Sequence, residues 1–183
     1  MLIAAKEVKL KNGKYIILKS PVPDDAEKML SHLKNVFNRY YQNMNHKKNH
    51  WDHFAVEDEA KILSDFALSP NKFMITAFNQ NEIVGNLGCF GMGGDFLNLN
   101  ARIGMGLETE FQSIGLGTAL LNYAIEQAKL LKFHRLELNV RTFNKTGIRL
   151  YEKVGFRQVG ILKETALIDE KFYDEYLYEL LLK

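Results

Sequence analysis

The chain has little of several features that mark large classes of protein. It contains one cysteine among 183 residues, which excludes an intrachain disulfide. Its apolar runs are far too short to cross a bilayer. The first residues also lack the charged segment and the long apolar stretch of a signal peptide. We therefore expect a cytoplasmic protein that does not contact a membrane.

The chain also lacks a large excess of positive or negative charge. Lysine and arginine number 24, aspartate and glutamate number 22, and the net charge is +2. The basic residues are scattered, so no basic patch for nucleic acid is expected. The remaining composition, 46% hydrophobic and 25% charged, is typical of a soluble globular protein. A chain of this length can bury roughly 70% of its unfolded surface, and we expect one domain over residues 1–183.

Periodicity and turn residues predict strands that alternate with helices. Residues 8–18 alternate around Asn12-Gly13, which is a strong hairpin signal. Helices are predicted near 23–37, 56–68, 114–131 and 145–154, and further strands near 72–78, 83–90, 97–107, 135–141, 156–161 and 175–182. This order predicts an α/β (α+β) fold with a mixed sheet flanked by helices.

The most informative stretch is the glycine-rich turn at 112–118. It lies between an apolar strand and a long amphipathic helix. Such a turn presents free N–H groups and the positive end of a helix dipole, which favour phosphate or pyrophosphate. Gly115 and Gly117 carry no side chain, so a ligand can approach the backbone closely. The pattern indicates a site for a cofactor that carries a nucleotide.

Two common nucleotide motifs do not fit this turn. A P-loop needs a lysine after its last glycine, and none follows Gly117. A dinucleotide-binding fingerprint needs a third glycine, which the stretch from Gly115 to Leu120 lacks. Another α/β class of nucleotide-phosphate-binding protein therefore remains only as an alternative, and it would bind ATP or NAD.

The turn fits a third pattern, Q-x-x-G-x-G, as Gln112-x-x-Gly115-x-Gly117. About thirty residues later, 144–156 reads N-K-T-G-I-R-L-Y-E-K-V-G-F. Together and in this order, the two motifs resemble the acetyl-CoA loop and the N-x-x-A-x-x-L-Y-E-K-x-G-F segment of the GNAT superfamily of N-acetyltransferases. Gly147 stands where alanine is usual. The resemblance covers residues 72–183, and the rest more loosely.

The resemblance implies a mixed, mostly antiparallel central sheet of the acyl-CoA N-acyltransferase type, in which two neighbouring strands splay apart around acetyl-CoA. Strand glycines such as Gly104 and Gly106 would mark a bulge, a close ligand approach, or mere packing. The resemblance also implies which residues bind the cofactor: Leu107, Thr109, Gln112, Ile114, Gly115, Leu116, Gly117, Thr118 and Asn144. No metal is implied.

The resemblance also supplies candidates for catalysis. Tyr151 matches the tyrosine beside the cofactor sulfur and would protonate the leaving thiolate. Many relatives carry a glutamate base in the strand before the loop, but Arg102 occupies that position here. Glu108 is the nearest carboxylate and is the candidate base, with a water chain to solvent as the alternative. Asn144 could also serve simply as a helix N-cap.

The acceptor side is expected to form from 37–54, which is rich in aromatic residues, and from 167–175, which is rich in carboxylates. Both suit a cationic amine. The acceptor is then a primary amine of a small molecule or a protein, and the pattern does not choose among ribosomal-protein termini, polyamines and small amines. The alternative function is an inactive acyl-CoA-binding module of the same fold. A homodimer is compatible with either function.

Two further residue types could carry chemistry. Cys89 lies in an apolar strand without a histidine partner in the sequence, so we expect a buried structural cysteine. His46, His50 and His53 could face one way on a helix and bind a metal. Two lysines lie between them and no carboxylate or cysteine cluster accompanies them, so a solvated segment on the substrate side is the preferred interpretation.

Overall fold

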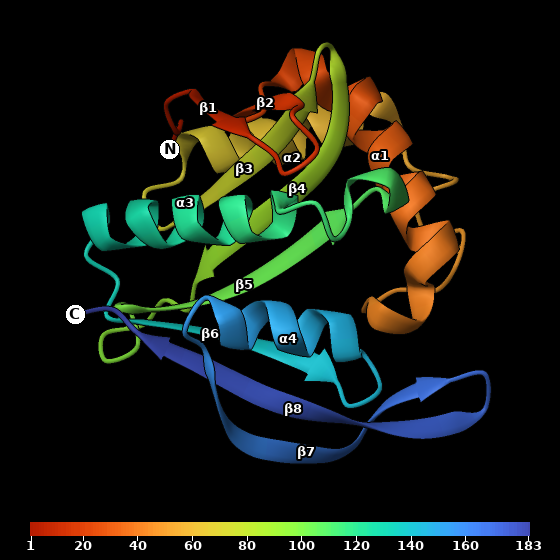
Figure 1. Cartoon of the computed structure of the whole chain (residues 1–183), viewed down its shortest axis with the longest axis vertical. Coiled ribbons are helices and arrows are strands. Elements are labelled where there is room, and N and C mark those ends of the chain that lie inside the picture. The colour runs from red at the N-terminus through yellow and green to blue at the C-terminus, as the bar shows by residue number, and fades with distance from the viewer.

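The computed structural model describes residues 1–183 as one eight-stranded sheet with four α-helices (Figure 1). The strands are β1 Lys6–Lys9, β2 Tyr15–Lys19, β3 Lys72–Asn79, β4 Glu82–Gly91, β5 Asn100–Leu107, β6 Arg135–Arg141, β7 Arg157–Ile168 and β8 Lys171–Leu181. The helices are α1 Ala26–Tyr40, α2 Val56–Leu68, α3 Leu116–Leu130 and α4 Lys145–Lys153, with short 3-10 turns at Pro23–Asp25, Tyr41–Asn43 and Thr109–Phe111. The sheet order is β1-β2-β3-β4-β5-β6-β8-β7. The predicted α/β architecture is confirmed.

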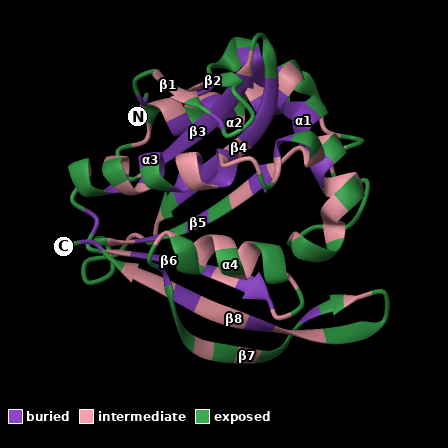
Figure 2. Ribbon diagram, viewed as in Figure 1, coloured by how far each residue is buried: buried purple, intermediate pink, exposed green.

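Helices cover both faces of the sheet. Strands β3 and β4 are the most buried (Figure 2). Their side chains contribute to two separate cores. On one face α3 packs through Leu116, Leu120 and Leu121 into the larger core. On the other face α1 and α2 form a smaller core around Leu63 and Phe66. Burial of these apolar side chains from water is the main force that holds the three layers together.

The gap between β5 and β6 is the feature that positions the site. Every other neighbouring pair of strands is antiparallel, but β5 and β6 are parallel. They pair only from Asn100–Arg135 to Arg102–Glu137 and then separate, while β6 continues along β8 as far as Arg141. The splayed strands implied by the resemblance are therefore present, and the sheet opens between α3 and α4 (Figure 1).

Several predicted boundaries were wrong. The strand expected from residue 97 begins at Asn100, because 97–99 form a turn. The last two strands are much longer than predicted and meet in a tight turn at Asp169-Glu170, where both residues have positive φ, 48° and 64°. The pairing of β4 with β5 runs without a register shift. The bulge considered at Gly104 and Gly106 is therefore absent.

Candidate active site

A cavity of about 520 Å³ lies in the gap between β5 and β6. Its lining comes from the loop before α3 and the start of that helix, from the end of β5, from β6 and α4, and from the end of α1 with the turn after it. Of the predicted cofactor-binding residues, it is lined by Leu107, Gln112, Gly115, Gly117, Thr118 and Asn144, and the predicted acid Tyr151 lines it as well. Two motifs that are about thirty residues apart in the chain thus meet around one space.

The loop before α3 has the conformation that an anion site requires. Ser113 and Gly115 have positive φ, 62° and 101°, and Gly115 is the N-cap of α3. The Lys11 N–H donates to the Ile114 carbonyl at 3.0 Å, which ties the loop to the first hairpin. None of the backbone N–H groups from Ser113 to Thr118 donates a hydrogen bond within the chain. They remain free for a ligand at the positive end of the helix dipole.

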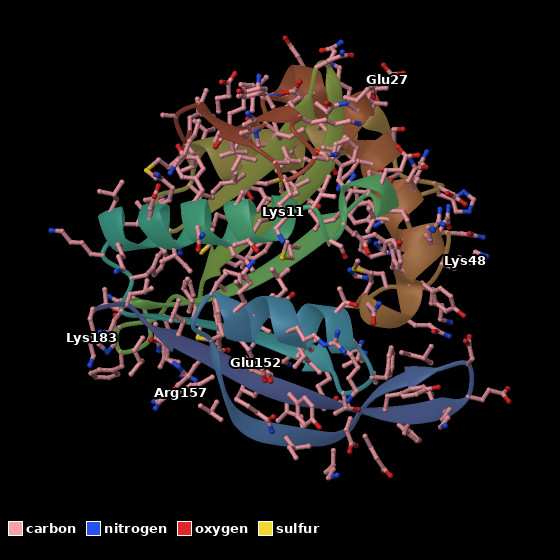
Figure 3. The ribbon with its side chains drawn as sticks, in the orientation of Figure 1. Lys11, Glu27, Lys48, Glu152, Arg157 and Lys183 are labelled. Atoms are coloured by element: carbon pink, nitrogen blue, oxygen red, sulfur yellow. The ribbon has the colours of Figure 1, made fainter.

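Cations surround this loop. Lys11, Arg149 and Lys153 all line the first cavity. The Lys11 side chain lies next to Gly115, 3.7 Å from where a Cβ on that glycine would stand, and Figure 3 shows it at the start of α3. Sequence reasoning missed Lys11, because only the folded hairpin brings it beside a loop one hundred residues away. Together with the free N–H groups, these charges suit phosphate groups.

We expect Lys11→Ala to weaken acetyl-CoA binding by about tenfold at low ionic strength, because a charge-assisted contact to phosphate is lost. The difference from wild type should shrink as salt is added, since salt screens exposed charges. Calorimetric titrations at two salt concentrations measure this. Lys129→Ala is the matched control, because Lys129 is exposed at the other end of α3. An equal loss in both variants would remove Lys11 from the site.

Tyr151 lies where the first cavity meets a second one, and it lines both. Helix α4 holds it against Phe156, with ring centroids 6.2 Å apart. Burial raises the pKa of its phenol to about 12. The group is therefore protonated at neutral pH and is able to donate a proton or a hydrogen bond.

Asn144 caps the helix that carries Tyr151. Its side-chain oxygen accepts a hydrogen bond from the Gly147 N–H at 2.9 Å. Gly147 matters to this cap, because a Cβ there would lie 2.8 Å from Asn144 Nδ2. On the opposite wall, Gln112 Nε2 donates to the Leu107 carbonyl at 3.2 Å and braces the loop against β5. Both side chains thus shape the cavity.

The second cavity measures about 430 Å³ and lies between the sheet and helices α1 and α2. Its wall contains the aromatic side chains Phe37, Trp51, Phe66 and Phe90. Its floor includes Gly104, where a Cβ would meet no atom within 4 Å, so the missing side chain leaves room there. The volume falls within the ~300–1,000 Å³ of small-molecule sites. The aromatic stretch 37–54 thus contributes to a cavity beside Tyr151.

The carboxylates of the second cavity are not those that the sequence suggested. Of the predicted group, only Glu175 lines it, paired with Arg141 in a buried salt bridge. Asp169 accepts a hydrogen bond from the Tyr41 hydroxyl at 2.8 Å, and Asp174 pairs with Lys163 at 2.8 Å. Glu59 was not predicted to contribute, yet it lines the cavity and is only 1% exposed.

Glu108 and Thr109 lie outside both of these cavities. They line a third, smaller cavity beside α1. Glu108 Oε1 is 3.0 Å from Nδ1 of the buried His32, and the other ring nitrogen of His32 is 3.1 Å from Asn86 Oδ1. The Thr109 hydroxyl is hydrogen-bonded to Tyr40 at 2.8 Å. The fold therefore places the candidate base near the end of β5 but not on the surface that Tyr151 faces.

The cysteine and the histidines that the sequence singled out lie in surroundings that indicate a structural role. Cys89 is fully buried, and burial raises the pKa of its thiol to about 12, so it is a poor nucleophile at neutral pH. His46 and His50 stack with ring centroids 3.9 Å apart. No group of three or more His, Cys, Asp or Glu side chains is placed to hold a metal ion. None of the four α-helices has the length and apolar character that crossing a bilayer requires.

Comparisons with known proteins agree with this fold. A spermidine N(1)-acetyltransferase of Vibrio cholerae is 23% identical over 74% of this chain and 82% of its own length. A GNAT-family acetyltransferase of Streptococcus pneumoniae superposes with a TM-score of 0.83 at 26% identity, over 91% of this chain and 99% of its own. YncA of Salmonella typhimurium, solved with its cofactor acetyl-CoA, gives a TM-score of 0.79 at 14% identity, over 92% and 94% of the two chains.

The family profile gives the assignment. The profile of the Acetyltransferase (GNAT) family matches residues 30–156, which include most of α1, the loop before α3 and the whole of α4. The match therefore spans both motifs and most of the residues that line the two cavities around Tyr151. The chain belongs to the acetyltransferase (GNAT) family.

Proposed function

We propose that this protein transfers an acetyl group from acetyl-CoA directly to a primary amine. Acetyl-CoA would occupy the first cavity, with its pyrophosphate on the free N–H groups from Ile114 to Thr118. The amine would enter from the second cavity. The observation that carries the proposal is that Tyr151 lines both cavities and so lies where the two substrates would meet.

The reaction requires proton transfers at the place where the two cavities meet. The neutral amine attacks the thioester carbonyl, the carbon–sulfur bond breaks, and the leaving thiolate takes a proton. We assign that proton to Tyr151, whose phenol is protonated at neutral pH and regains a proton from solvent after the thiolate has taken its own. The attacking amine loses one proton. Cys89 takes no part, because it is buried in β4 and lines neither cavity.

The route of the amine proton follows from the position of Glu108. Its carboxylate faces His32 in the third cavity. We therefore propose that the proton leaves through water to solvent, which was the alternative left open by the sequence. The proposal includes a cytoplasmic location, which is consistent with the single, unpaired Cys89.

The pH dependence separates the two routes. Activity should rise with pH in the wild type, because a lysine-like amine has a pKa near ~10.4 and only its neutral form attacks. Glu108→Gln should show the same rise with the same midpoint if water takes the proton. A profile displaced to higher pH with a lower maximum would instead identify Glu108 as the base. Turnover of one good amine between pH 6 and 10, for both forms, decides between them.

The proposal itself is tested by turnover. Purified protein with acetyl-CoA and a panel of primary amines should release coenzyme A only when an accepted amine is present, and mass spectrometry should find the amine heavier by one acetyl group. Binding of acetyl-CoA without transfer to any member would favour the inactive acyl-CoA-binding module. Transfer only to hydroxyl or thiol acceptors would refute the amine assignment.

A further inference from the structure

Buried polar atoms without a partner are concentrated in one place in this protein. Six buried side-chain nitrogen or oxygen atoms have no hydrogen bond of good geometry in the chain, and one of them, Arg135 Nε, still lies 2.9 Å from Glu179 Oε2. Four of them belong to residues that line the second cavity: Trp51 Nε1, Glu59 Oε2, Asn139 Oδ1 and Arg141 Nε. An unpaired buried polar group costs about 1–3 kcal/mol. This concentration therefore indicates a ligand that supplies the missing partners.

The four groups are of two kinds. Trp51 Nε1 and Arg141 Nε are N–H donors, and Glu59 Oε2 and Asn139 Oδ1 are acceptors. The orientation of the Asn139 amide is fixed, since its nitrogen donates to Glu175 Oε2 at 3.2 Å and its oxygen faces away. A ligand that satisfies all four must itself contain both hydrogen-bond donors and an oxygen that accepts hydrogen bonds, a combination that an amide group provides.

The charges around the cavity indicate whether the ligand's accepting oxygen belongs to a carboxylate or to a neutral carbonyl. Arg141 is 6% exposed and already neutralised by Glu175, while its Nη2 donates to the Met44 carbonyl at 3.2 Å. Glu59 stands without a cation, and its burial raises the pKa of the carboxyl to about 7. A carboxylate ligand would add negative charge beside Glu59, and both arginines that line the cavity, Arg102 and Arg141, are already paired with glutamates. A neutral carbonyl avoids this cost.

We propose that the acceptor is a small amine that carries an amide, such as an amino acid amide. Its carbonyl would accept from Trp51 and Arg141, and its N–H groups would donate to Glu59 and Asn139. A polyamine brings donors only and would leave both N–H groups unpaired. The inference rests on the proposed function, because it treats the second cavity as the acceptor site.

The kinetic test compares leucinamide with 3-methylbutylamine, which lacks the amide, and with spermidine. Each kcat/KM is divided by the fraction of neutral amine, which removes the difference in protonation state between the acceptors. Leucinamide should be at least about tenfold better than either amine, because a site built for a hydrogen bond rejects an analogue without it. Equal or better use of spermidine or of the alkylamine would overturn the proposal.

Two variants link the preference to the cavity. Trp51→Phe keeps an aromatic ring and loses the N–H, and Glu59→Gln keeps the size of the side chain and loses the carboxylate. Each should lower kcat/KM for leucinamide by about tenfold more than it lowers kcat/KM for the alkylamine, which has no amide to lose a partner. Thr76→Val is the matched control, because that hydroxyl is equally buried and unpartnered but lies outside the cavity. Equal losses for both acceptors in Trp51→Phe and Glu59→Gln would contradict the proposal.

A binding measurement keeps the inference separate from turnover. Trp51 is the only tryptophan in the chain, so its fluorescence reports occupancy of the second cavity directly. N-acetylleucinamide should bind at least about tenfold more tightly than N-(3-methylbutyl)acetamide. If that preference appears while no amine is acetylated, the inference stands and the proposed function fails. Equal affinities would overturn the inference even in an active enzyme.

Discussion

Replacing Tyr151 by phenylalanine should lower turnover by about 10²-fold or more, because positioned proton transfer to the leaving thiolate is lost. The dissociation constant of acetyl-CoA should stay within about twofold of the wild-type value. The phenol is assigned to charge that develops only during transfer, and such an interaction affects turnover rather than binding. Steady-state kinetics and calorimetric titration of the same preparation measure both quantities.

Tyr176→Phe provides the matched control for this variant. Tyr176 is a half-buried tyrosine in β8 that lines neither cavity, so loss of its hydroxyl should leave turnover within about twofold. Wild-type turnover in Tyr151→Phe would exclude Tyr151 as the acid. A loss of turnover accompanied by an equal loss of acetyl-CoA affinity would show that Tyr151 shapes the cofactor site instead.

The second large effect is expected at Gly117. Valine there should weaken acetyl-CoA binding by about 10²-fold, because its side chain would keep phosphate from the N–H groups at the start of α3. The structure adds a complication. A Cβ at this position would lie 2.8 Å from Leu150 Cδ2 and 3.3 Å from Leu107 Cδ1, so the variant also presses α3 against α4 and β5.

A second substitution separates these two causes. Gly117→Val combined with Leu150→Ala removes the closest side-chain contact while the blocked approach to the backbone remains. We expect the double variant to bind acetyl-CoA as weakly as Gly117→Val. Recovery of affinity in the double variant would mean that packing, and not access to the backbone, is what Gly117 provides. Thermal unfolding of both variants and of Leu150→Ala alone verifies that each is folded.

The spacing of apolar residues along the sequence predicted the helices and strands that have one buried face. Helix α2 and strand β6 have the predicted bounds, because their apolar residues recur with the period of a helix or face a core. The distal part of the β7–β8 hairpin has no such signal. Most of its residues are exposed, and the register shifts between Leu162 and Ala166. Without a buried face, its strands have no alternation to reveal them.

Six of the residues predicted to bind the cofactor line one cavity, and the sequence could group them because their motifs are contiguous. A loop such as 112–118 carries its geometry in its own residues. The acceptor side is assembled from distant elements, and Glu59 shows why it was missed. It is the third acidic residue in a row at the start of α2, where acidic side chains ordinarily complement the helix dipole. Only the packing of α2 onto the sheet buries the Glu59 side chain at the second cavity.

The short pairing of β5 with β6 has a consequence for how the molecule melts. The first cavity is lined by Leu107 and Thr118 on one side of the gap and by Asn139, Asn144 and Tyr151 on the other. An occupant therefore braces two halves that the sheet itself joins by three residue pairs. Because such a ligand binds the folded chain alone, saturation should raise the unfolding temperature. Amide hydrogens in α4 should then exchange more slowly. The local stability of the C-terminal half would therefore depend on how much of the protein has the ligand bound.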